Sequence, residues 1–205
     1  MTALYKANSE NKVTNEVLFI DAGVREPLEL VRIENKISKN GNKFLAIYLK
    51  DKSGAEVSKT EWEPKDNDPK ILQQKADRLM ARLNHMLVDS GILREEEMKF
   101  EVNSFDELGQ KLIDLVITSG RNKGKYIRAK VVYDDNGFTT LPNYTKYTWI
   151  ESVSVPKEES KIKLLSIDKI ERVKADAPNA ANINPFDTDP DIDSAVPSID
   201  NDPFA

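Results

Sequence analysis

Apolar and polar side chains alternate with a period of two from Leu28 to Trp62, which is typical of β-strands. Two turn sequences rich in Gly, Asn, Asp and Ser interrupt the alternation at residues 39–42 and 51–54. The pattern therefore predicts three consecutive antiparallel strands.

The alternation also predicts how the first two strands pair. A two-residue turn would place Ile37 opposite Phe44 and would set charged residues beside core aliphatic residues. A three-residue loop over residues 40–42 avoids this conflict, so we expect the longer loop. The expected pairs are Ile37 with Leu45 and Ile33 with Leu49.

One face of this predicted three-stranded unit combines cationic and aromatic side chains. Val31, Ile33 and Ile37 are expected to share the opposite face of the first strand. Trp62 is expected on the outer face of the third strand together with Ser58 and Thr60. The cationic and aromatic residues expected on the outer face of the first two strands are Arg32, Lys36, Phe44 and Tyr48.

Two amphipathic helices follow the strands. The first begins after the N-cap Asp68 with a proline at its first position, and Gly91 ends it. The second begins at Ser104, whose Ser-Phe-Asp-Glu sequence is a capping box, and runs to Gly120.

Period-two alternation returns after a basic loop at residues 121–125. It predicts a strand from Tyr126 to Tyr133, a turn at residues 134–137, and a returning strand from Phe138 that Pro142 interrupts. Residues 151–173 fit either a short strand or a helix that closes the domain.

The predicted order of elements is β-β-β-α-α-β-β, which is the order of an oligonucleotide/oligosaccharide-binding (OB) barrel with a helical insertion. The fold class is therefore expected to be mainly β. The second helix is expected to lie against the side of the barrel. Residues 1–174 have the size of one domain, and we assign them to a single-stranded nucleic-acid-binding domain.

The segment from residue 175 to the end differs sharply in composition. It contains seven aspartates, five prolines and no lysine or arginine. The net charge of −5 therefore divides into −7 for this segment and +2 for residues 1–174. Such a segment cannot bury enough apolar surface to offset its ordering entropy. We therefore expect residues 175–205 to form a disordered acidic tail.

Residues 121–149 interleave cations with aromatic rings. This segment has a local charge of +4 and holds six of the fifteen aromatic residues. Single-stranded nucleic acid is bound in this way, because cations hold phosphates while unstacked bases lie on ring faces. Ordinary sheet formers with cationic neighbours would give the same pattern, and that structural alternative stays open.

The sequence contains no convincing enzyme or metal motif. The only histidine, His85, lies within the first helix without a second histidine or a cysteine to act with it. Asp187 to Asp193 have the alternate spacing of a calcium loop, but Ile192 replaces its glycine and Ser198 its final glutamate. We expect no enzyme activity, no cofactor and no metal site.

Two Pro-Phe motifs stand among the acids of the tail, at Phe186 and at Phe204. Acidic residues steer an arm to basic surfaces, and a phenylalanine fills a small apolar pocket there. The tail is therefore expected to bind proteins, although a merely solubilising tail stays open.

The whole arrangement resembles single-stranded DNA-binding proteins of the bacterial and bacteriophage type. The tip of the tail carries the likeness, and the basic strand 126–133 with its 138–142 return adds to it, in the manner of phage variants. The tip residues in question are Asp200, Asp202, Pro203 and Phe204. The resemblance implies a body that coats DNA without reading sequence and a tail that recruits replication and recombination proteins. In the family the phenylalanine is usually the last residue, whereas Ala205 follows it here, so altered docking is expected.

These observations predict a protein that binds single-stranded DNA during replication, recombination or repair. The main rival is a protein–protein adaptor that acts through its Pro-Phe motifs, and a carbohydrate-binding OB module or an inactive-looking enzyme is a second. Without a signal peptide, a membrane-length apolar run or a cysteine, the expected location is the cytoplasm, that of a bacterial host if a phage encodes the protein. The expected DNA-binding residues are Arg32, Lys36, Lys43, Phe44, Tyr48, Trp62, Lys123, Lys125, Tyr126, Arg128 and Lys130.

Overall fold

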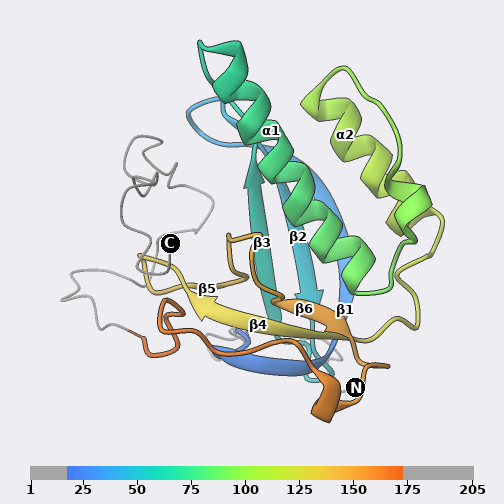
Figure 1. Ribbon diagram of the computed structural model, residues 1–205, viewed down its shortest axis with the longest axis vertical. Coiled ribbons are helices and arrows are strands. Elements are labelled where there is room, and N and C mark those ends of the chain that lie inside the picture. Colours follow the sequence, from blue (N-terminus) through green and yellow to red (C-terminus); the bar gives the residue numbers. More distant parts are fainter. Residues whose placement is uncertain (1–17, 173–205) are drawn as a thin grey trace, which may run out of the picture.

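The computed structural model of the chain describes residues 18–172, and Figure 1 shows how its elements are arranged. The strands are β1 Gly23–Ile37, β2 Lys43–Lys50, β3 Glu56–Trp62, β4 Ile127–Tyr133, β5 Thr139–Thr140 and β6 Ile150–Ser152. The helices are α1 Pro69–Asn84 with the π-helical η1 His85–Asp89, the 3-10 helix η2 Glu95–Met98, α2 Phe105–Leu112 with the π-helical η3 Ile113–Thr118, and the 3-10 helix η4 Lys157–Glu159.

Five of these strands form a ring. Hydrogen bonds connect all six strands in the order β1-β2-β3-β5-β4-β6, and an additional pairing of β1 with β4 closes the ring of β1, β2, β3, β5 and β4. The long strand β1 makes this possible, because residues 23–28 pair with β4 while residues 29–37 pair with β2. The contact between β3 and β5 is parallel and involves Ser58 and Thr140, and the other pairings are antiparallel. The fold is a mixed sheet with a helical insertion between β3 and β4.

The pairing of β1 with β2 corrects the predicted register. Ile33 lies opposite Ile47 and Lys36 lies opposite Phe44, so the expected pairs Ile33 with Leu49 and Ile37 with Leu45 are wrong. The connection takes up five residues, 38–42, in which the Ser38 N–H donates to the Asn42 carbonyl (2.8 Å). Two additional residues in the loop preserve the predicted faces, because side chains alternate with a period of two.

An irregularity at Val31 changes the face of the first part of β1. The register shifts between Leu30 and Arg32, so Leu30 enters the main core while Val31 packs on the opposite side of the sheet. The prediction that Val31 shares a face with Ile33 is therefore wrong. Ile37, at the end of the strand, is 69% exposed rather than part of the core.

The two predicted helices are confirmed. The Asp68 carboxylate accepts from the Lys70 N–H (2.8 Å), and the Ser104 hydroxyl accepts from the Glu107 N–H (3.2 Å). Each helix satisfies its first free amides through its own N-cap, as its sequence predicts. Figure 1 shows α1 crossing in front of β2 and β3 with α2 beside it.

The main core lies between the strands of the ring and these helices. Leu45, Ile47 and Leu49 of β2 pack there with residues of both helices and of β4. Residues 151–173, which the sequence left open, begin within the short strand β6, which pairs with β4. Across residues 18–172, every helix is too short or too polar to serve as a membrane span.

Candidate nucleic-acid interface

The structure places the predicted cationic and aromatic residues of β1, β2 and β3 on one face of the sheet. Arg32 lies opposite Tyr48, Lys36 opposite Phe44, and Phe44 opposite Trp62. We call the surface formed by these five residues the outer face. Trp62 shares it with Ser58 and Thr60, as expected from the alternation along β3.

The aromatic rings of the outer face form a small second core. Phe44, Ala46 and Tyr48 are buried, and Val31 and Trp62 pack against them. The Phe44 and Trp62 ring centroids are 4.8 Å apart at an interplanar angle of 43°. Phe44 and Tyr48 are only 2% and 6% exposed, so the expectation that their rings offer open stacking surfaces is wrong. Trp62 is the partly exposed ring of this cluster.

The cations of the outer face are held by carboxylates and by Tyr48. The Arg32 guanidinium lies 3.6 Å from the Tyr48 ring centroid and donates to both Glu56 carboxylate oxygens (2.8 and 2.7 Å). The hydrogen bonds to Glu56 raise the pKa of Arg32. The Lys36 ammonium donates to the Tyr48 hydroxyl (2.8 Å) and lies 2.9 Å from Glu34. A phosphate that binds here has to compete with two carboxylates.

A shallow hollow connects the outer face to the basic loop before β4. The hollow has a volume of about 140 Å³, and its lining includes both Val31 and Tyr126. Val31 also packs against the Phe44–Tyr48 cluster, so the outer face and the hollow are continuous. Tyr126 is 45% exposed, and the neighbouring Lys123 and Lys125 are exposed as predicted.

Arg128 and Lys130 do not belong to this surface. The structure buries both side chains, with 4% and 0% of their surface exposed. Arg128 donates to Glu151 (2.7 Å) and to Glu26, while Lys130 donates to Asp168 and to the Tyr144 hydroxyl (2.7 Å each). The expectation that these cations form an open basic strip is wrong, because β6 and the chain that follows it cover β4 with carboxylates.

Lys43, a predicted DNA-binding residue, does not belong to the outer face either. It neighbours Phe44 in β2, so its side chain starts on the opposite side of the strand from the aromatic cluster. Its ammonium lies 2.5 Å from the Asp106 carboxylate of α2. Lys43 therefore connects the sheet to a helix instead of extending the outer face.

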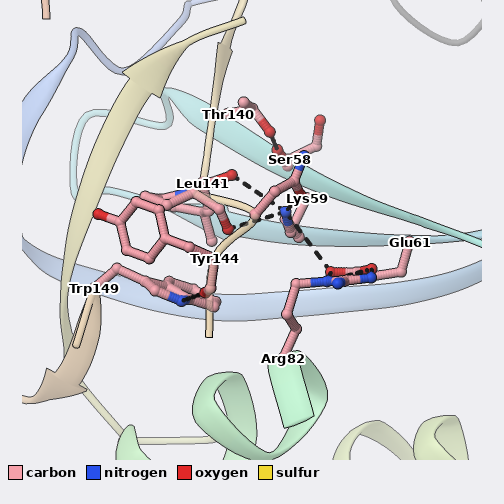
Figure 2. A network of polar contacts seen from close by, with 10 residues as sticks. Ser58, Lys59, Glu61, Arg82, Thr140, Leu141, Tyr144 and Trp149 are labelled. Atoms are coloured by element: carbon pink, nitrogen blue, oxygen red, sulfur yellow. Dashed lines mark hydrogen bonds and ion pairs between the residues drawn. The ribbon is translucent and has the colours of Figure 1, made fainter. Parts of the chain in front are cut away.

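Sequence reasoning missed a buried ionic network on the inner side of β3, shown in Figure 2. Lys59 and Glu61 are 2% and 3% exposed, and Arg82 of α1 binds Glu61 through both carboxylate oxygens. The Lys59 ammonium donates to the carbonyls of Leu141 (3.2 Å) and Pro142 (3.0 Å) and to the Asn143 side chain. Alternation with the outward Ser58, Thr60 and Trp62 was the signal that could have located Lys59 and Glu61 inside.

This network fixes the chain between β5 and β6. Burial lowers the pKa of Lys59 to about 8, against the opposing effect of Glu61. The Trp149 indole donates to the Tyr144 carbonyl (3.0 Å), and burial followed by the Asp168 carboxylate raises the pKa of Tyr144. His85, the single histidine, lies 2.9 Å from the Thr145 carbonyl. These groups are structural anchors of the loop.

The remaining predictions concern residues or sites that the structure does not describe. The tail residues Asp200, Asp202, Pro203 and Phe204 lie outside residues 18–172, as do both Pro-Phe motifs. Within the described range, no group of three or more His, Cys, Asp or Glu side chains is arranged to hold a metal ion.

A scan against protein-family models gives no match for this chain, and a search of curated proteins finds no similar sequence.

Proposed function

We propose that the protein binds single-stranded DNA without sequence specificity and that the ring of five strands is an OB barrel. The strand order β1-β2-β3-β5-β4 with a return to β1, the parallel contact between β3 and β5, and the helices between β3 and β4 support this assignment. OB domains bind single strands on the face formed by strands 2 and 3, which here carries the aromatic cluster.

The observation that carries the proposal is the continuity of partly exposed rings and cations across the outer face. Trp62 lies at one end, Arg32 stacks on Tyr48 in the middle, and Tyr126 lies at the other end beyond the hollow. Aromatic faces accept unpaired bases of any identity, and cations hold the phosphates between them. Duplex DNA keeps its bases stacked on one another and does not use such rings.

The proposal gives the predicted residues different roles. Trp62 and Tyr126 offer ring surface to bases, and Lys123 and Lys125 offer charge to phosphates. Phe44 and Tyr48 support Trp62 and Arg32 from below. Arg128, Lys130 and Lys43 stabilise the fold instead, since carboxylates of the protein hold all three.

We further propose, from the sequence alone, that the acidic tail recruits replication and recombination proteins through Phe204. A chain segment with seven aspartates and a Pro-Phe motif near its tip suits a basic protein surface with a small apolar pocket. The adaptor alternative keeps this role for the tail and removes DNA binding from the body.

Tryptophan fluorescence tests the DNA-binding proposal. The protein has two tryptophans, and Trp149 is fully buried while Trp62 is partly exposed. Oligo-dT should quench the emission of the wild type and of a Trp149→Phe variant, but not that of Trp62→Phe. Salt should weaken the binding, because phosphate contacts release counterions. Equal affinity for duplex, or no binding at low salt, would contradict the proposal and favour the adaptor.

A further inference from the structure

The hollow beside Tyr126 has the size and the walls of a site for one six-membered ring. Its volume is about 140 Å³. A cavity of about 150 Å³ is known to hold a benzene ring, so a pyrimidine base matches this space better than a two-ring purine. Pro27, Val31 and Tyr126 provide its apolar walls.

Tyr126 provides a face on which a base can stack. It is 45% exposed although it directly precedes the buried strand β4. A large aromatic side chain that lines a hollow and stays exposed offers the stacking energy that single-strand binders use.

The polar lining of the hollow includes two carboxylates. One oxygen of Asp51 already accepts from the Ser53 amide (2.8 Å), the Ser53 hydroxyl (2.6 Å) and the Ala55 amide (3.0 Å). Glu29 is exposed, and no hydrogen bond or ion pair engages its side chain within residues 18–172. The hollow therefore presents hydrogen-bond acceptors, and the Glu29 carboxylate has free capacity.

Two lysines complete the lining. Lys50 and Lys52 are exposed at the turn between β2 and β3, where neither makes an ion pair with another described residue. A nucleotide whose base enters the hollow would leave its phosphate at the rim, where these cations can neutralise it.

We propose that this hollow is a nucleotide subsite that prefers cytosine over uracil and thymine. The inference rests on the proposed function and adds a base preference at one position of the bound strand. Cytosine carries an exocyclic amino group that donates to a carboxylate such as Glu29, as acidic side chains accept from cytosine in base recognition. Uracil and thymine place a carbonyl oxygen at the same position, and two acceptors facing each other repel.

The experiment compares oligo-dC with oligo-dU, because these bases differ at position 4 and in the protonation of N3 but not in ring size. Oligonucleotides of about 12 residues span one OB domain. For each protein we take the ratio of its affinity for oligo-dC to its affinity for oligo-dU. This ratio should be about fivefold higher for the wild type than for Glu29→Gln, which is the low end of discrimination by a base-specific hydrogen bond. The ratio between the two proteins cancels any base preference that other subsites contribute.

Two further variants give the test its controls. Tyr126→Ala should weaken binding of both oligonucleotides and remove the preference, because the base is no longer held in the hollow. Glu101→Gln, which changes an exposed carboxylate that does not line the hollow, should keep the wild-type ratio.

The outcomes separate the subsite from the proposed function. If wild type and Glu29→Gln show the same dC-to-dU ratio while both bind single strands, the subsite is wrong and single-strand binding stands. If neither oligonucleotide binds to the wild type at low salt, the proposed function is wrong and the subsite falls with it.

Discussion

Replacing Lys130 by methionine should destabilise the protein without changing the proposed electrostatic contact with DNA. Lys130 has no exposed surface, and its ammonium lies 2.7 Å from the Asp168 carboxylate, which is itself 1% exposed. Methionine keeps most of the volume but leaves the Asp168 charge buried without its cation. Removing one partner of a buried ion pair costs about 3–5 kcal/mol. Asp168 keeps hydrogen bonds from the Tyr144 hydroxyl (3.0 Å) and the Leu165 amide (2.7 Å), so we expect about 3 kcal/mol.

Urea unfolding followed by the emission of buried Trp149 measures this loss. The double variant Lys130→Met with Asp168→Asn should recover part of it, because the uncompensated charge is then gone. A matched control is Lys125→Ala, in which the exposed cation before β4 is removed and stability should change by less than about 0.5 kcal/mol.

The same two substitutions should have the reverse effects on DNA binding, where Lys125→Ala should change the salt dependence and Lys130→Met should not. Lys125→Ala should lower the slope of log affinity against log salt by about 0.7, the value for one phosphate contact on a single strand. Lys130→Met, measured where it is folded, should keep the wild-type slope. A stable Lys130→Met protein with a reduced slope would refute the reasoning, because Lys130 would then have to reach the phosphates.

Three further predictions follow from the structure and the sequence. Tyr48→Ala should lower the free energy of unfolding in urea by about 3 kcal/mol, because it empties the second core. Tyr48→Phe should lower it by about 1 kcal/mol, because only the hydrogen bond from Lys36 is lost. A Tyr48→Ala protein of normal stability would contradict the packing. Burial lowers the pKa of Lys59 from 10.5 to about 8, so the unfolded chain binds more protons between these values and the free energy of unfolding rises with pH there. Between about pH 7.5 and 9.5 we expect a rise of about 2 kcal/mol that Lys59→Met lacks, and equal pH profiles of the two proteins would show that Lys59 keeps its ordinary pKa. Deleting residues 175–205 changes the formal charge from −5 to +2, so DNA affinity measured by anisotropy should rise most at low salt; an unchanged affinity at every salt concentration would show that the tail does not compete for the DNA-binding face.

Patterns within a few residues predicted the faces of β2 and β3, the face of β1 after its irregularity at Val31, and the ends of both helices. Ile33 and Ile47 point into the core as the alternation required, and Asp68 and Ser104 cap their helices as expected. These features depend on side-chain alternation and on local hydrogen bonds, which the sequence displays directly.

The register of the first hairpin could not be derived in the same way. Alternation distinguishes even from odd offsets, but loops of three and five residues give the same faces. The Ser38 hydroxyl accepts from the Asn42 N–H (3.1 Å) and Gly41 has a φ of +80°, and this turn geometry selects the longer loop. The ring closure between β1 and β4 joins residues about a hundred positions apart, and no local pattern indicates it.

The misplacement of Arg128 and Lys130 has one physical origin. Along β4 cations alternate with aliphatic residues, which is the usual pattern of a strand with one face in water. Here both faces are covered, and the second cover comes from a segment whose own sequence shows no clear periodicity.

Glu151 and Asp168 of that segment provide the carboxylates that make burial of the two cations possible. A strand pattern indicates which side chains share a face, whereas exposure of that face depends on chain that packs on it from elsewhere. Near the hollow, the exposed cations are Lys50 at the end of β2, Lys52 in the turn that follows, and Lys123 and Lys125 in the loop before β4. Lys50 and Lys52 line the hollow beside Tyr126, and Lys123 and Lys125 come just before Tyr126 in the chain, so these four cations gather near the hollow. A bound strand would accordingly be held most tightly at the Tyr126 end, and its salt dependence would come from these four lysines.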